Sequence, residues 1–221
     1  MTKALAKRIL SATWRQIQMN PLSRPCYNRV MMWRHCSRPV RMLDIGPGIF
    51  RLAGFETVDV VGGRHITYVV DASGKLPFRD ATFDLIHASH VLEHFPWYQS
   101  AFVLTEWWRV LKPGGSLEVW VPDAFKICNV LLEAENGTTC TVPDDWCPEN
   151  PKKNPYLWVA GRLFWGANPH YPSWHKALFT PGHLKRSLED VGFRGVRLMD
   201  RSEVRATDHG WINLGMKGTK P

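Results

Sequence analysis

A short stretch near residue 45 places two carboxylates and a glycine turn close together. Asp44 ends a short apolar run, Gly46 and Gly48 follow it, and Asp59 ends the next apolar run. Glycine lets the backbone approach a ligand without a Cβ in the way. Carboxylates bind cations and accept hydrogen bonds from hydroxyl groups, and each charge-assisted bond is worth about 1.5–3 kcal/mol. This stretch therefore has the composition of a ligand site.

The segments around this stretch alternate between strand and helix patterns. Strands are predicted from the short apolar runs at 40–45, 56–60, 65–70, 83–89 and 116–122, and helices at 95–111, 123–135 and 181–191. Two last runs, 193–200 and 211–217, lie close in the sequence and fit an antiparallel edge hairpin. Because parallel neighbours need a crossover, this order predicts an α/β fold with a doubly wound, mostly parallel seven-stranded sheet.

Ligands of an open parallel sheet bind beyond the carboxyl ends of its strands, so Asp44 and Asp59 should face one crevice. The dinucleotide fingerprint Gly-x-Gly-x-x-Gly fails, because Arg51 takes its last glycine position. A pyrophosphate would also lie next to the Asp44 charge. S-adenosylmethionine (SAM) has an ammonium group, a sulfonium and a ribose with two hydroxyls, which suit the two acids. The sequence therefore predicts a SAM crevice.

Three further motifs follow the glycine turn: VVDASGKLPF at 69–78, FDLIHASHVLEHF at 83–95 and RVLKPGG at 109–115. In their order and spacing the chain resembles class I SAM-dependent methyltransferases of the branch called methyltransferase type 11. The resemblance is strong over 40–122 and looser over 174–217. It implies a Rossmann-like methyltransferase fold with SAM as the cofactor.

The resemblance also implies which residues bind the cofactor. They are Asp44, Ile45, Gly46, Pro47, Gly48, Asp59, Val60, Asp71, Ala72, Ala88, Ser89 and His90. The glycine turn would line the methionine and ribose, Asp59 would hold the ribose hydroxyls, and Asp71 would accept from the adenine amine. Residues 88–90 would lie under the methionine. The alternative for Asp71 is a turn or N-cap residue, and for His90 and Glu93 a helix-start residue that stabilises the first turn.

The interval between Asp44 and Asp59 leaves room for a helix of at most a turn or two. The cofactor would then be more exposed than usual, or covered by another segment. The N-terminal leader and the Trp-rich insertion described below are the natural candidates for that cover.

Two histidines are candidates for the catalytic base. An oxygen or nitrogen acceptor must lose a proton, and histidine takes protons near neutral pH. His94 follows the fourth strand and His175 follows the insertion, so both could face the methyl group. The alternative for each is a histidine that only satisfies backbone partners. No spacing typical of metal ligands occurs, so no metal is expected.

The basic residues are concentrated at the N-terminus. The formal charge of the chain is +8, yet nine Lys or Arg and no acidic residue precede Asp44, so the remainder is close to neutral. We therefore divide the chain into a basic leader, 1–38, with an amphipathic helix at 3–19, and a methyltransferase domain, 39–221. Residues 1–41 could contact nucleic acid or an anionic membrane, or the helix could simply pack on the sheet.

An insertion rich in Trp and Pro, 137–175, interrupts the alternation of strands and helices. Its aromatic residues could form a substrate wall or merely pack an irregular flap. The predicted function is methyl transfer to an oxygen or nitrogen of a small-molecule or glycan acceptor. The alternatives are a nucleic-acid methyltransferase that uses the basic leader and a catalytically silent SAM-binding subunit.

Cellular location is predicted from features that are missing. No apolar run approaches the roughly 20 residues that span a bilayer, and Met1 to Leu10 lack the apolar core of a secretory signal. The five cysteines are odd in number and lack metal-type spacing. We therefore expect reduced thiols and a cytoplasmic protein, with a disulfide between Cys140 and Cys147 as a minor alternative.

Overall fold

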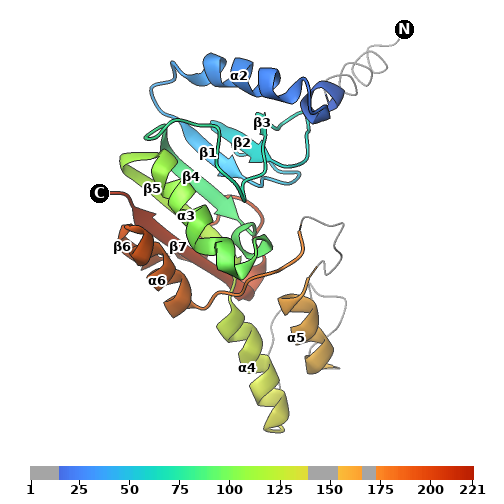
Figure 1. Ribbon diagram of the computed structural model, residues 1–221. Helices are drawn as coiled ribbons and strands as arrows, with labels where there is room; N and C mark the ends of the chain where they lie inside the picture. The colour runs from blue at the N-terminus through green and yellow to red at the C-terminus, as the bar shows by residue number, and fades with distance from the viewer. Residues whose placement is uncertain (1–14, 139–153, 166–172) are drawn as a thin grey trace.

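Seven strands form one mixed sheet through the middle of the molecule (Figure 1). The computed structural model describes residues 15–138, 154–165 and 173–221. The strands are β1 (Met42–Ile45), β2 (Phe55–Asp59), β3 (Tyr68–Val69), β4 (Phe83–Ser89), β5 (Leu111–Pro122), β6 (Arg194–Leu198) and β7 (Asn213–Thr219). Their order is β3-β2-β1-β4-β5-β7-β6. Neighbours from β3 to β5 are parallel, and β7 runs antiparallel to both β5 and β6, which confirms the predicted fold class and edge hairpin.

The helices of the described residues are α2 (Arg24–His35), α3 (Ser100–Val110), α4 (Ala124–Glu135), α5 (Pro155–Leu163) and α6 (Pro181–Val191). Short 3₁₀ helices are η1 (Leu92–His94), η2 (Trp97–Gln99), η3 (Arg201–Glu203) and η4 (Gly210–Ile212). The predictions for α4 and α6 are confirmed, and Gly192 ends α6 in the left-handed conformation at φ 115°. Of the helix predicted at 3–19, residues 15–19 are helical and the rest lies outside the described residues.

The helix predicted at 95–111 is shorter than expected. Pro96 holds an extended backbone, residues 97–99 form η2, and α3 begins only at Ser100. Leu111 already belongs to β5. Periodicity alone cannot locate these ends, because the 3₁₀ turn and the start of the strand carry apolar residues as the helix does.

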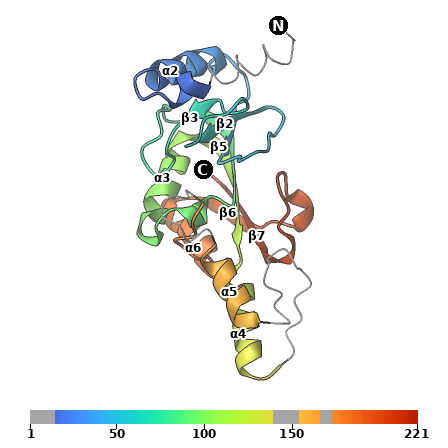
Figure 2. The same ribbon diagram turned by 90° about the vertical axis from the view of Figure 1, so that its right-hand side faces the viewer.

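The main core lies between the sheet and the helices α3 and α6, which pack side by side on one face (Figure 2). Leu43, Ile86 and Val119 of three neighbouring strands are fully buried, as are Trp107 of α3 and Leu188 of α6. This core fixes the carboxyl ends of β1 and β4, where the expected ligand crevice begins.

A second, smaller core joins α4 and α5, which extend away from the sheet (Figure 1). It contains Ile127 and Val130 of α4, Trp158 and Val159 of α5, and Ile212. The insertion is therefore not irregular throughout, since 155–163 is a helix and Trp158 is a core residue. Residues 139–153 and 166–172 of the insertion lie outside the described part of the chain.

Helix α2 packs against the free edge of β3. The Asn28 amide donates to the Val69 carbonyl and accepts from the Val69 N–H, both at 3.1 Å. Tyr27 and Gln18 are buried beside it, and the Gln18 amide donates to the Ile66 carbonyl at 3.0 Å. The described part of the leader thus covers a sheet edge, although the division at residue 38 stays a prediction.

Two further expectations concern cysteines and membrane spans. Cys26, Cys36 and Cys128 are free thiols, whereas Cys140 and Cys147 lie outside the described residues. Among the described helices, none has the length and apolar character that crossing a bilayer requires.

Candidate active site

The glycine turn after β1 has the backbone conformation that only glycine adopts readily. Gly46 and Gly48 have φ values of 66° and 58°. A Cβ on Gly46 would lie 2.4 Å from Cγ2 of Val91, so the close approach also requires glycine. No helix forms between Asp44 and Asp59, which agrees with the expectation of at most a turn or two.

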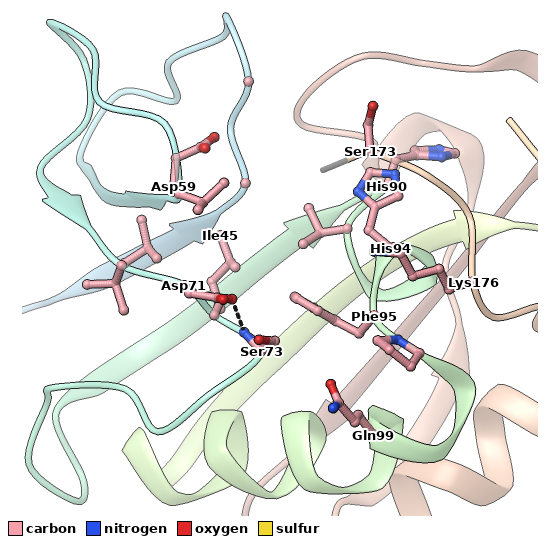
Figure 3. A pocket seen from close by; sticks show the side chains of 18 residues that line it. Ile45, Asp59, Asp71, Ser73, His90, His94, Phe95, Gln99, Ser173 and Lys176 are labelled. Carbon is pink, nitrogen blue, oxygen red and sulfur yellow. Dashed lines mark hydrogen bonds between the residues drawn. The ribbon is translucent and has the colours of Figure 1, made fainter. Parts of the chain in front are cut away.

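A cavity of about 540 Å³ opens beyond the carboxyl ends of β1, β2 and β4 (Figure 3). Most of the predicted cofactor residues line it: Ile45, Gly46, Gly48, Asp59, Val60, Asp71, Ala72 and His90. Val58 and Val70 add apolar surface on the strand side, and Phe95, Gln99 and Lys176 close the opposite side. These last five residues were missed from the sequence, because they come from apolar or surface positions without a recognisable spacing.

Asp59 and Asp71 lie on the strand side of this cavity (Figure 3). The Asp59 carboxylate accepts a hydrogen bond from the Val61 N–H at 2.8 Å, and burial raises its pKa. The Asp71 carboxylate accepts from the Ser73 N–H at 2.9 Å. Both side chains are therefore held in place by the loop that follows them.

Four predicted cofactor residues do not line the cavity: Asp44, Pro47, Ala88 and Ser89. Asp44 is buried beside the paired strand β4, and its carboxylate accepts a 2.8 Å hydrogen bond from Nδ1 of His87. Its predicted contact with the methionine part of SAM stays a prediction. The sequence did not indicate that His87 would form a hydrogen bond with Asp44.

A second cavity, of about 190 Å³, adjoins the first and shares His90, His94 and Ser173 with it. His175 and His209 also line it. The two candidate bases, His94 and His175, thus lie together, with their rings stacked at a centroid distance of 5.5 Å. The structure brings both next to the predicted cofactor site.

Comparison with known proteins now identifies the fold and the cofactor. Residues 27–119 match the family model described as a methyltransferase domain. The chain carries a SAM-dependent methyltransferase domain. Its family uses SAM, and the cavity fits that cofactor, because Gly46 and Gly48 line it without side chains while Asp59 and Asp71 stand at the ends of neighbouring strands.

Individual relatives of this methyltransferase domain are distant or partial. It is 41% identical over 75 residues to a demethylmenaquinone methyltransferase of Anoxybacillus flavithermus, a match that spans 34% of this chain and 30% of the relative. A SAM-dependent methyltransferase from Methanosarcina mazei has a similar fold, with a TM-score of 0.50 and 18% identity, covering 86% of this chain and 96% of that one. A putative methyltransferase from Bacillus halodurans matches with a TM-score of 0.46 and 17% identity, over 88% and 98% of the chains.

The histidines of the methyltransferase domain surround one buried acid, Glu93. Burial lowers the pKa of His94 to about 4 and also lowers that of His175, so both are neutral at pH 7. Burial opposes the charge of Glu93, but the adjacent His90 outweighs that effect and lowers the pKa of the carboxyl. The described residues therefore combine neutral imidazoles with an ionised carboxylate.

His209 completes this group and was missed from the sequence. Its ring lies 4.0 Å from that of His90, measured between centroids, and burial lowers its pKa to about 4. Nothing in its sequence neighbourhood suggests a site, since it comes from the loop between β6 and β7. Only the antiparallel insertion of β7 beside β5 brings this loop to the cavity.

Proposed function

We propose that this methyltransferase domain transfers the methyl group of SAM to an oxygen or nitrogen of a small-molecule or glycan acceptor in the second cavity. SAM supplies a methyl group bonded to a sulfonium. The observation that carries the proposal is the wall shared by the two cavities, formed by His90, His94 and Ser173. An acceptor in the smaller cavity would meet the cofactor where these three residues border both cavities.

Methyl transfer is an in-line displacement, so the protein contributes mainly by positioning the two reactants. The turn at Gly46 and the acids Asp59 and Asp71 would hold the cofactor from the strand side. Val91 and Phe95 add apolar surface to the cofactor cavity and would help to exclude water. Gly46, Asp59 and Asp71 lie at or just after the ends of β1, β2 and β3, so the sheet supports them.

The size of the second cavity limits the acceptor. Its volume of about 190 Å³ is smaller than the roughly 300–1,000 Å³ of drug-sized ligand pockets. A single ring, a single sugar unit or the end of a larger acceptor fits this volume. Trp165 lies in the lining and offers a stacking surface for such a ring.

A protein base, if one acts, is expected to be His175 or His94. Replacing the base by Ala should lower turnover by roughly 10²–10⁴ while SAM affinity changes little, because proton removal matters on the way to the transition state. We favour His175, since it follows the insertion and lies in the second cavity but not among the residues of the first. A His175→Ala enzyme that keeps its turnover rate would show that His175 is not the base.

A nucleic-acid acceptor is less compatible with the arrangement of the elements. The described basic residues Arg29 and Arg34 are exposed on α2, at one end of the molecule, whereas α4 and α5 lie at the other end (Figure 1). The second cavity is next to α5, through Arg162 and Trp165. Phosphates bound along α2 would therefore lie far from the acceptor cavity.

The test is release of S-adenosylhomocysteine in the presence of a panel of acceptors. The panel should contain phenols, amines, monosaccharides, demethylmenaquinone and a short RNA. We expect turnover with a ring-bearing or sugar acceptor and none with RNA. Binding of SAM without turnover on any member of the panel would instead favour a silent SAM-binding subunit.

A further inference from the structure

We propose that Glu93, His94 and His175 bind a divalent transition-metal ion at the wall between the two cavities. One ligand atom from each of the three residues lies within 4.8 Å of the other two. Glu93 and His94 are neighbours in η1, and His175 arrives from a segment far along the chain. The sequence predicts no metal, because it contains no metal-ligand motif with short spacing. These three ligands come from two segments that are distant in the sequence.

The backbone holds these residues in fixed positions. The N–H groups of Lys176 and Ala177 both donate to the Glu93 carbonyl, at 2.7 and 3.1 Å. The segment that carries His175 is therefore tied directly to η1. These backbone hydrogen bonds hold the three residues together, so the cluster does not depend on flexible surface side chains.

The Glu93 side chain is the independent observation that points to a ligand. It is 1% exposed, and among the described residues no donor makes a well-aligned hydrogen bond to either carboxylate oxygen. Within this part of the chain only imidazole nitrogens approach Oε1, at 3.1 Å from His90 and 3.9 Å from His175. A buried carboxylate without hydrogen bonds is costly unless a cation balances it. A metal ion among Glu93, His94 and His175 would supply that balance.

The imidazole of His175 is oriented as a metal ligand would be. Its Nδ1 lies 3.0 Å from the Arg162 carbonyl, which can only accept, so Nδ1 carries the hydrogen. The other nitrogen, Nε2, then has a free lone pair and lies 3.9 Å from Oε1 of Glu93. Metal-binding histidines usually donate their second N–H to a carbonyl or carboxylate in this way.

His90 gives the same indication, and it approaches the same oxygen of Glu93 as His175 does. The Asn213 amide donates to Asp208 through Nδ2 at 2.9 Å, so its oxygen must accept from Nε2 of His90, also at 2.9 Å. The remaining nitrogen, Nδ1, lies 3.1 Å from Oε1 of Glu93. Two lone pairs this close repel unless a cation or a proton lies between them.

The ligand set selects the class of ion. Two imidazoles and one carboxylate suit Zn²⁺, Co²⁺ or Mn²⁺ better than Mg²⁺ or Ca²⁺, which prefer oxygen ligands. Three protein ligands also leave at least one coordination position open, as in catalytic zinc sites. His94 and His175 line the second cavity, so the open position would face the acceptor.

This site would give the proposed function a way to activate an oxygen acceptor, and that role rests on the proposed function. An ion that binds the acceptor hydroxyl lowers its pKa. In the transfer the acceptor oxygen loses its proton to solvent and forms a bond to the methyl carbon. The carbon–sulfur bond breaks and its electron pair stays on sulfur. His94 and His175 would then hold the ion and would not themselves take the proton.

The test measures metal binding to the full chain without SAM or acceptor. Calorimetry should show one Zn²⁺ per chain and no heat with Mg²⁺, and Co²⁺ should give visible absorption bands. Glu93→Gln and His175→Ala should each weaken Zn²⁺ binding by at least about 100-fold, since even loss of an outer partner costs 10–100-fold. His183→Ala, which removes an exposed histidine on α6, should leave Zn²⁺ binding unchanged.

Thermal unfolding of each variant checks that it folds. If Glu93→Gln does not fold, His175→Ala provides the test, because His175 is only half-buried. Absence of Zn²⁺ binding in the wild type, or Zn²⁺ binding as tight in both ligand variants as in the wild type, would overturn the site. The first result would leave a proton on His90 to explain its approach to Glu93. A protein that binds Zn²⁺ but not SAM would refute the proposed function and leave the metal site standing.

Discussion

Asp59 is the residue whose role follows most directly from its position. It ends β2 and lines the larger cavity, where a carboxylate can accept from both ribose hydroxyls. We predict that Asp59→Ala weakens SAM binding at least about tenfold, because one charge-assisted hydrogen bond is worth about 1.5–3 kcal/mol. Asp190→Ala, which removes an exposed acid of α6, is the matched control. Equal calorimetric affinities of wild type and Asp59→Ala for SAM would show that Asp59 does not contact the cofactor.

Gly46 allows a second residue-scale prediction. Gly46→Ala should lower the free energy of unfolding by about 1–3 kcal/mol. Alanine would be strained at the positive φ of this position, and its Cβ would clash with the Val91 side chain. Gly182→Ala is the control, since a Cβ at Gly182 meets nothing within 4 Å. Urea unfolding should show a lower midpoint for Gly46→Ala alone. Equal midpoints for both variants would contradict the account of the turn.

At this scale the sequence indicated the strand-end residues better than the residues of the opposite wall. Gly46, Gly48, Asp59 and Asp71 could be predicted because parallel strands bring their carboxyl ends together. The approach of His209 could not, since it depends on a long-range pairing of β7 with β5. Local patterns do not contain that information.

The edge of the sheet depends on α2 in a way that a single substitution can test. Asn28 satisfies both backbone groups of Val69, as a further strand would. Asn28→Ala should therefore lower the free energy of unfolding by about 1–3 kcal/mol, the cost of unsatisfied buried polar groups. Asn136→Ala, at the exposed end of α4, should change it little. A neutral Asn28→Ala would show that α2 does not support β3.

Strands β5 and β7 are joined by an ion cluster that should make stability depend on pH. Glu118 is buried, which opposes its charge, but hydrogen bonds from Arg205 and Lys217 outweigh burial and lower its pKa below the usual 4.5. A lowered folded-state pKa means that this stabilisation is present above about pH 4.5 and is lost as the pH falls through the folded pKa.

Glu118→Gln should accordingly be less stable than wild type at pH 7, with the difference shrinking toward pH 3. Urea unfolding at a series of pH values measures this difference. Glu189→Gln, which loses an exposed pair with Lys185 on α6, should show a much smaller effect. A difference between Glu118→Gln and wild type that stays constant with pH would contradict the assignment.

Periodicity predicted the elements of the methyltransferase domain well where they are long and buried. Strand β4 and helix α6 were predicted with the bounds that the structure shows, because apolar spacing and the Pro and Gly signals agree there. Helix α5 was not predicted, since prolines and tryptophans hide its pattern. Its apolar side is satisfied by α4, a partner that only the tertiary structure reveals.

At the scale of the whole molecule, the sheet separates two regions with different properties. The basic helix α2 covers the β3 edge, while the paired helices α4 and α5 lie toward the other end (Figures 1 and 2). The histidine-lined cavity borders α5 at Arg162. The cofactor cavity lies between these regions and borders the second cavity at His90, His94 and Ser173. Cofactor and acceptor would therefore occupy adjoining cavities and meet at these shared residues.

A crystal structure with S-adenosylhomocysteine tests this arrangement most directly. The account predicts that the ribose hydroxyls contact Asp59, the adenine lies by Asp71, and the sulfur faces His94 and the side of the second cavity. A ligand whose sulfur points away from His94, or one bound outside the cavity of about 540 Å³, would contradict it.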